Sequence, residues 1–113
     1  MNVQIFGTKK SFDSKKAERY FKERGIKYQF VDMKEKGLSK GELNSVCQAV
    51  GGYEKLIDPK CKDKNLLALV QYLSEEDKKE KILENQKIIR TPIVRNGKQA
   101  TVGYEPDVWK DWK

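Results

Sequence analysis

The sequence predicts an α/β fold in which helices flank a four-stranded mixed sheet. Three observations support this prediction. The opening third of the chain alternates strand, helix and strand, and residues 88–113 contain two strand-like segments and a helix. Between them, residues 38–87 carry only helical signals. Strands at both ends of the chain must pair with one another to bury their apolar sides, and helices must cover the resulting sheet.

The opening unit consists of a strand over residues 2–6, a helix over 12–24 and a strand over 26–31. The helix has one apolar stripe, formed by Ala17, Tyr20 and Phe21. In the second strand, apolar and polar residues alternate, which is typical of a strand with one buried face. A strand, a crossover helix and a strand within so short a stretch predict two parallel strands.

The middle of the chain is predicted to be a series of helices. Ser39 and Glu42 have the spacing of a capping box, which begins a helix that ends at Gly51. A short turn follows over 53–57, and further helices are predicted over 63–73 and 74–86.

The end of the chain returns to strands. Residues 92–94 and 100–102 flank Asn96-Gly97, a pair typical of a β-hairpin turn. A final helix over 105–112 is expected to pack its apolar side chains against the sheet. These side chains are Val108, Trp109 and Trp112.

This order of elements, βαβ, then helices, then ββα, is that of a thioredoxin-like fold with a helical insertion. We therefore expect one domain over residues 1–113, because a chain of this length buries a single core. Its two thioredoxin-like halves are predicted at 1–33 and 88–113, and the insertion at 38–87.

Composition excludes several classes of protein. The net charge is +7, but the 24 basic residues are spread along the chain, which argues against a nucleic-acid site and favours a solvated surface. The chain contains no histidine, so neither histidine-activated nucleophiles nor histidine metal sites are expected, and we expect no bound metal. An apolar run long enough to cross a membrane is absent from the sequence, and so is a secretory signal. The two cysteines, Cys47 and Cys61, form no CxxC pair, and a reduced, cytoplasmic protein is the expectation.

Six short motifs resemble, in order and spacing, those of the ArsC/Spx/YffB family of arsenate-reductase-like proteins. They are Gly7-Thr-Lys-Lys-Ser11, Ser14-Lys-Lys-Ala17, Gly25-Ile-Lys-Tyr28, Leu56-Ile-Asp-Pro-Lys60, Ile88-Ile-Arg-Thr-Pro92 and Val102-Gly-Tyr104. The resemblance covers nearly the whole chain. It implies a site at the loop between the first strand and the first helix.

The resemblance places Ser11 where the family carries its nucleophilic cysteine. A serine hydroxyl is far less acidic than a thiol and forms neither an arsenic–sulfur bond nor a disulfide. Two interpretations of Ser11 remain: an anion contact kept at a helix N-terminus, or an ordinary N-cap.

The family's oxyanion cradle of arginines is also altered. The resemblance gives Lys10, Ser11, Lys60 and Arg90 as the anion-binding candidates, with ordinary solvated lysines as the alternative. Thr91 occupies the slot directly before the proline, where the family usually has arginine. Tyr104 occupies the last arginine slot of arsenate reductases.

Three residues are expected to shape the site without reacting, namely Thr91, Pro92 and Tyr104. In thioredoxin-like folds the proline before this strand is usually cis and borders the active-site loop. The resemblance therefore implies a cis Thr91-Pro92 bond beside Ser11.

The two cysteines are expected to have different roles. Cys47 lies on an apolar helical stripe and is expected to be a buried, inert side chain. Cys61 lies between Lys60 and Lys62 in a loop that the family places near the site. Because flanking cations lower a thiol pKa, Cys61 is the candidate reactive thiol, with a non-reactive loop cysteine as the alternative.

Two functional hypotheses follow. The first is a non-enzymatic binding or regulatory protein, whose partner, by resemblance to Spx, would be the RNA polymerase α-subunit. The second is a glutathione-linked thiol oxidoreductase acting through Cys61. Neither hypothesis requires a resident cofactor; the small ligands considered are an oxyanion, glutathione or another thiol.

Overall fold

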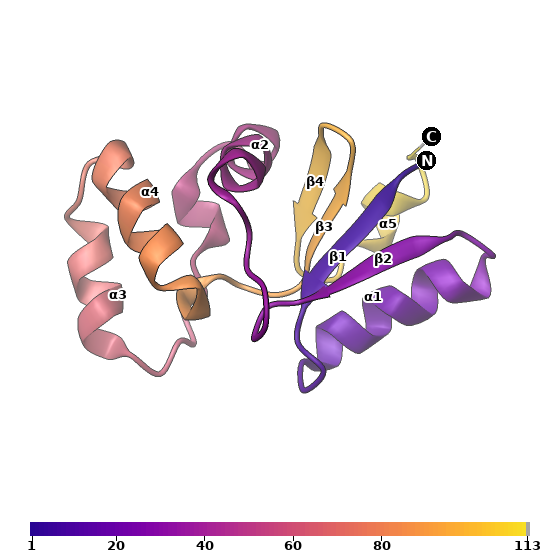
Figure 1. Ribbon diagram of the computed structural model, residues 1–113, viewed down its shortest axis with the longest axis horizontal. Helices are drawn as coiled ribbons and strands as arrows, with labels where there is room; N and C mark the ends of the chain where they lie inside the picture. Colours follow the sequence, from indigo (N-terminus) through magenta and orange to yellow (C-terminus); the bar gives the residue numbers. More distant parts are fainter. Residues whose placement is uncertain (113) are drawn as a thin grey trace.

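The computed structural model describes residues 1–112, and its centre is a four-stranded mixed sheet in the order β2-β1-β3-β4 (Figure 1). β1 pairs in parallel with β2 and antiparallel with β3, and β3 pairs antiparallel with β4. The strands are β1 (Val3–Gly7), β2 (Tyr28–Asp32), β3 (Ile93–Asn96) and β4 (Gln99–Val102). The α/β class, the mixed sheet and the parallel opening pair are confirmed.

Helices cover both faces of the sheet. One face carries α1 (Phe12–Glu23) and α5 (Pro106–Trp109), and the other carries α2 (Lys40–Val50), which packs on β4. Beyond α2 lie the remaining helical elements, which together with it form what we call the helical lobe. These elements are η1 (Tyr53–Leu56), α3 (Lys64–Gln71), α4 (Glu75–Glu84) and η2 (Gln86–Ile88). The predicted capping box at the start of α2 is present, with Ser39 and Glu42 each bonded to the other's backbone N–H.

Strand β1 contributes to the cores on both faces. Val3 and Ile5 pack with α1 and α5, whereas the next residue, Phe6, packs with the helical lobe. Because side chains alternate along a strand, the antiparallel partners follow the same division. Val94, opposite Ile5, joins the first core, and Ile93, opposite Phe6, joins the second.

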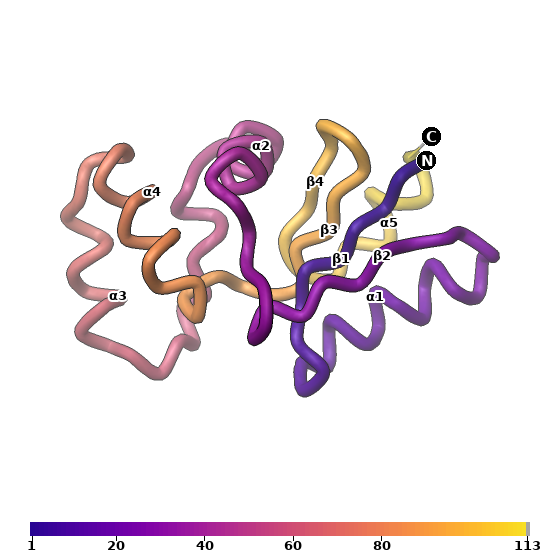
Figure 2. The backbone as a smooth tube through the Cα atoms, in the orientation of Figure 1, coloured from indigo at the N-terminus to yellow at the C-terminus, as the bar shows by residue number. Residues whose placement is uncertain are grey.

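Uncharged hydrogen bonds and an ion pair hold the helical lobe to the rest of the chain; the ion pair joins Glu42 of α2 to Arg95 of β3 at 3.6 Å. The chain leaves the sheet after β2 and returns to it before β3 (Figure 2). The side-chain amide of Gln86 accepts from the backbone N–H of Leu38 (2.7 Å) and donates to its carbonyl (2.8 Å). Ile57 and Ile89 form an isolated antiparallel bridge. The outgoing segment is therefore fixed by the side-chain amide of Gln86, and the returning segment by a backbone bridge.

The structure differs from prediction at the end of the chain. The last helix ends at Trp109 rather than continuing to residue 112, and Val108 is 43% exposed, so its predicted packing is wrong. Trp109 and Trp112 are buried, as expected. The hairpin loop consists of Gly97 and Lys98, one residue later than the predicted Asn96-Gly97 turn, with Gly97 at φ 61°. Of the helices within residues 1–112, none has the length and hydropathy that a membrane span requires.

Replacing Trp109 with Phe is expected to destabilise the fold. The indole Nε1–H of Trp109 donates to the buried Thr101 hydroxyl at 2.8 Å, and its ring contacts Tyr20, Phe21 and Tyr104. Losing this bond leaves a buried hydroxyl without that donor, which costs about 1–3 kcal/mol in the free energy of unfolding. Urea denaturation measures this loss. The neighbouring Val108→Ala should change stability by less than about 0.5 kcal/mol, and equal losses in both variants would contradict the assigned role of Trp109.

Candidate functional site

Ser11 is the N-cap of α1. Its backbone is extended (φ −77°, ψ 122°) and its Oγ accepts a hydrogen bond from the backbone N–H of Ser14 at 3.2 Å. The hydroxyl thus takes up one of the free N–H groups at the start of the helix. Of the two interpretations of Ser11, the structure therefore shows the N-cap.

The loop before α1 is held by a second serine. The buried Ser14 Oγ accepts from the backbone N–H of Thr8 at 3.3 Å. Ser14 also lies so close to Gly7 that a Cβ at Gly7 would collide with its Oγ. Sequence reasoning missed this contact, because it depends on how the end of β1 meets the first turn of α1.

Thr91 and Pro92 lie beside Ser11, as the resemblance implied. The Thr91-Pro92 bond is cis, and the Thr91 hydroxyl donates to Ser11 Oγ at 3.5 Å, a long hydrogen bond between residues 80 apart in sequence. The carbonyl of Pro92 accepts from the N–H of Gly103 at 2.8 Å. The first loop, the cis proline and the end of β4 are therefore joined by hydrogen bonds.

Hydrogen bonds do not join the predicted cations to Ser11 in the described part of the chain. Lys10 and Lys60 are exposed, and within residues 1–112 no hydrogen bond links the side chain of Lys10, Lys60 or Arg90 to Ser11. Arg90 packs against Gly103, where a Cβ would lie 3.1 Å from its Nη2. It lines a cavity of about 430 Å³ with Lys55 and Glu105. A bidentate cradle of the kind that arginines provide is not assembled by these contacts.

Tyr104 lies toward α1. Its ring contacts Trp109 edge-to-face at 5.5 Å between centroids, and Lys16 Nζ lies 5.4 Å from its centroid. Tyr104 is thus part of the surface along α1.

The two cysteines differ in burial. Cys61 is only 8% exposed and belongs to the core of the helical lobe, whereas Cys47 is half-buried on α2. Burial raises the pKa of the Cys47 thiol, and it also raises the pKa of the neighbouring Tyr53 to about 12. Cys47 is less buried than expected. Cys61 turns inward from its loop to pack with the lobe, which favours the alternative of a non-reactive cysteine.

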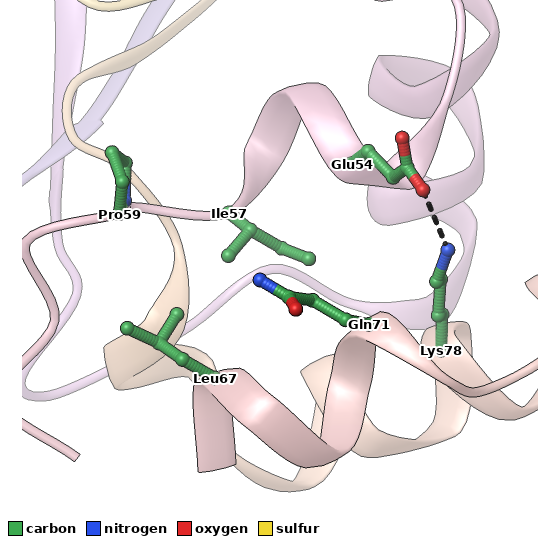
Figure 3. Close-up of a pocket in the computed structure, with 6 residues that line it drawn as sticks. All are labelled: Glu54, Ile57, Pro59, Leu67, Gln71 and Lys78. Carbon is green, nitrogen blue, oxygen red and sulfur yellow. Dashed lines mark hydrogen bonds and ion pairs between the residues drawn. The ribbon is translucent and has the colours of Figure 1, made fainter. Parts of the chain in front are cut away.

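A cavity of about 560 Å³ lies within the helical lobe (Figure 3). Ile57, Pro59 and Leu67 form its apolar walls, and Gln71 projects between them and an ion pair. In that pair Lys78, 5% exposed, donates to Glu54 at 2.9 Å. This hydrogen bond raises the pKa of Lys78 and lowers that of Glu54. Nothing in the sequence indicates a buried lysine, because in the charged run 75–81 Lys78 looks like any solvated residue.

The sheet order and the cis proline beside the start of α1 invite comparison with known proteins. The model of the ArsC family matches residues 6–112. The chain belongs to the ArsC family.

Three similar proteins show how far this likeness extends. The global transcriptional regulator Spx 2 of Oceanobacillus iheyensis is 27% identical over 100% of this chain and 94% of its own. An arsenate reductase of Vibrio cholerae has a TM-score of 0.82 at 26% identity, covering 96% of this chain and 94% of its own. An ArsC-family-related protein of Bacteroides fragilis has a TM-score of 0.88 at 19% identity, covering 100% and 98%. The last of these shows the shared fold alone.

Replacing Ser11 with Ala is expected to lower the free energy of unfolding by roughly 1 kcal/mol, because the N–H of Ser14 loses its cap. Chemical denaturation measures the change. Ser74→Ala is the matched control, since Ser74 caps α4 through the same hydrogen bond to the third residue along. An unchanged stability in Ser11→Ala alone would contradict the cap assigned to Ser11.

Neither native cysteine is expected to react quickly with oxidised glutathione near neutral pH. The raised pKa of Cys47 keeps its thiol protonated, and burial shields Cys61 from the reagent. A time course of mixed-disulfide adducts, mapped by peptide mass spectrometry, measures both sites at once. Denatured protein, in which both thiols are exposed, is the positive control. Fast, selective modification of Cys61 in the folded protein would revive the oxidoreductase hypothesis.

Proposed function

We propose that this chain is a non-enzymatic, regulatory member of the ArsC family that acts by binding a protein partner. The observation that supports this most directly is the state of Ser11. By the resemblance, Ser11 stands at the position of the family's nucleophile, and its hydroxyl is engaged as the N-cap of α1 and as the acceptor for Thr91. A serine there cannot form the arsenic–sulfur bond, and the chain has no histidine to activate it.

The surroundings of Ser11 agree with a loss of oxyanion chemistry. Arsenate reduction needs cations that hold the substrate next to the nucleophile. By the resemblance, Thr91 and Tyr104 take the arginine slots of the family, and in the structure Arg90 packs against Gly103. The thiol alternative is weakened by the burial of Cys61 in the helical lobe.

A regulatory role is supported by the full-length likeness to the transcriptional regulator Spx 2. By this resemblance, the first partner to test is the carboxy-terminal domain of the RNA polymerase α-subunit. A basic surface and a fold free of catalytic thiols are compatible with such a role, because binding needs only a stable, complementary face.

Titration calorimetry of the purified chain with this polymerase domain is expected to give saturable binding. The same preparation, incubated with arsenate, glutathione and glutaredoxin, is expected to give no arsenite. Arsenite formation by the unaltered chain would contradict the proposal. So would an absence of binding to the polymerase domain together with fast adduct formation at Cys61.

Ser11→Cys is the matched control for the missing nucleophile. A thiol at this N-cap has its pKa lowered by the helix N-terminus and is expected to form glutathione adducts faster than Cys47 or Cys61. It should still fail to reduce arsenate, because the arginine slots stay filled by Thr91 and Tyr104. Full activity in Ser11→Cys would mean that the cysteine is all that the site lacks.

A further inference from the structure

The exposed side of α1 carries an aromatic and cationic surface that the chemistry around Ser11 does not use. Phe12 is 78% exposed and Tyr104 is 37% exposed. Lys16 lies between them, with its Nζ 5.8 Å from the ring centroid of Phe12 and 5.4 Å from that of Tyr104. The ammonium group thus makes a cation–π contact with each ring and links the two into one surface.

This surface continues into a cavity of about 310 Å³. Lys16 and Tyr104 line it together with Arg19, Tyr20, Glu23 and Arg24. The guanidinium of Arg24 lies 3.8 Å from the Tyr20 ring centroid and donates to the Tyr20 carbonyl. Three cations and one carboxylate therefore surround a cavity with aromatic walls. We call Phe12, Lys16, Arg19, Arg24 and Tyr104, with this cavity, the α1 groove.

The first part of α1 and the loop before it carry an excess of positive charge. Residues 9–19 carry five lysines or arginines against two carboxylates, Asp13 and Glu18. One of the two, Glu18, accepts a hydrogen bond from the Tyr28 hydroxyl. The local field is positive and attracts an acidic partner before contact.

The side chain of Phe12 does not contribute to the hydrophobic core. The cluster formed by Tyr20, Phe21 and Trp109 is closed on the inner face of α1, and the Phe12 ring lies outside it. Buried aromatic and arginine side chains are the residues that contribute most to the energy of protein interfaces. Phe12 and Tyr104 therefore have the residue type and the exposure expected of side chains in a protein interface.

We propose that the α1 groove binds an acidic protein segment that carries one large apolar side chain. The acidic residues face Lys16, Arg19 and Arg24, and the apolar side chain enters the cavity beside Tyr104. This inference rests on the proposed function, for which it names the binding surface and the chemistry of the partner. Charge complementarity at Lys16, Arg19 and Arg24 favours a peptide of this kind.

The test uses calorimetric titration with a panel of short synthetic peptides of alternating glutamate and serine. Each peptide carries one central residue, chosen from Trp, Phe, Leu and Ser. Binding is expected for a peptide with an apolar centre and is expected to vanish with the serine centre or with glutamine in place of glutamate. Phe12→Ala and Lys16→Glu should each weaken binding by about tenfold or more. Tyr72→Ala should change it less than about twofold, because Tyr72, 87% exposed, lies at the end of α3 and outside the groove.

Four outcomes would overturn the proposal. These are no binding by any peptide of the panel, binding that ignores the central residue, tighter binding of a single-stranded oligonucleotide, and binding unaffected by Phe12→Ala. A peptide with the chain's own sequence over residues 69–78 is included, because it combines Leu69 and Tyr72 with a run of carboxylates. Tighter binding of this peptide, together with sedimentation that depends on protein concentration, would assign the groove to a second copy of the chain.

Failure of this inference is distinguishable from failure of the proposed function. If Phe12→Ala and Lys16→Glu bind the polymerase domain as well as the unaltered chain does, the groove proposal fails and the binding function stands. If the polymerase domain does not bind but the acidic peptides do, the groove stands and the partner must be another protein. Unchanged urea denaturation of both variants ensures that the comparison is made between folded proteins.

Discussion

The burial of strand β1 between two apolar layers is the constraint on which the rest of the structure depends. Val3 and Ile5 enter the core under α1, and Phe6 enters the core of the helical lobe. Both faces of β1 are therefore covered. The strand ends at Gly7, and the chain then turns into α1. Because β3 runs antiparallel beside it, the segment before β3 arrives at this same end. Ser11 and Thr91 meet because the strands that precede and follow them are paired.

Local signals in the sequence were enough for the elements and their order. The capping box at Ser39, the alternation in β2 and the proline after Thr91 each act over a few residues, so each could be read directly. Packing between distant segments could not be read in this way. The inward turn of Cys61 and the burial of Lys78 against Glu54 depend on how η1, α3 and α4 meet, and neither leaves a periodic trace in the sequence.

At the site the division is similar. The resemblance placed Ser11, Thr91 and the cis proline together, since their spacing follows from the strand order. It could not place Arg90 or Tyr104, whose side chains are long enough to reach several neighbours. The loop has a geometry that suits a helix-capping group, and within residues 1–112 the candidate oxyanion ligands Lys10, Lys60 and Arg90 make no hydrogen bond to Ser11.

The amide hydrogen bonds between Gln86 and Leu38 hold the helical lobe by a contact that does not depend on charge. Neither partner carries a charge, and the nearby bridge between Ile57 and Ile89 is likewise made by backbone groups. Dissolved salt screens charges over a distance of about 10 Å at 0.1 M and has little hold on contacts of this kind. These contacts are therefore insensitive to ionic strength, whereas the ion pair between Glu42 and Arg95 and the attraction along α1 both weaken as salt is added. Changes in ionic conditions would therefore alter the long-range attraction along α1 more than the uncharged contacts that hold the lobe.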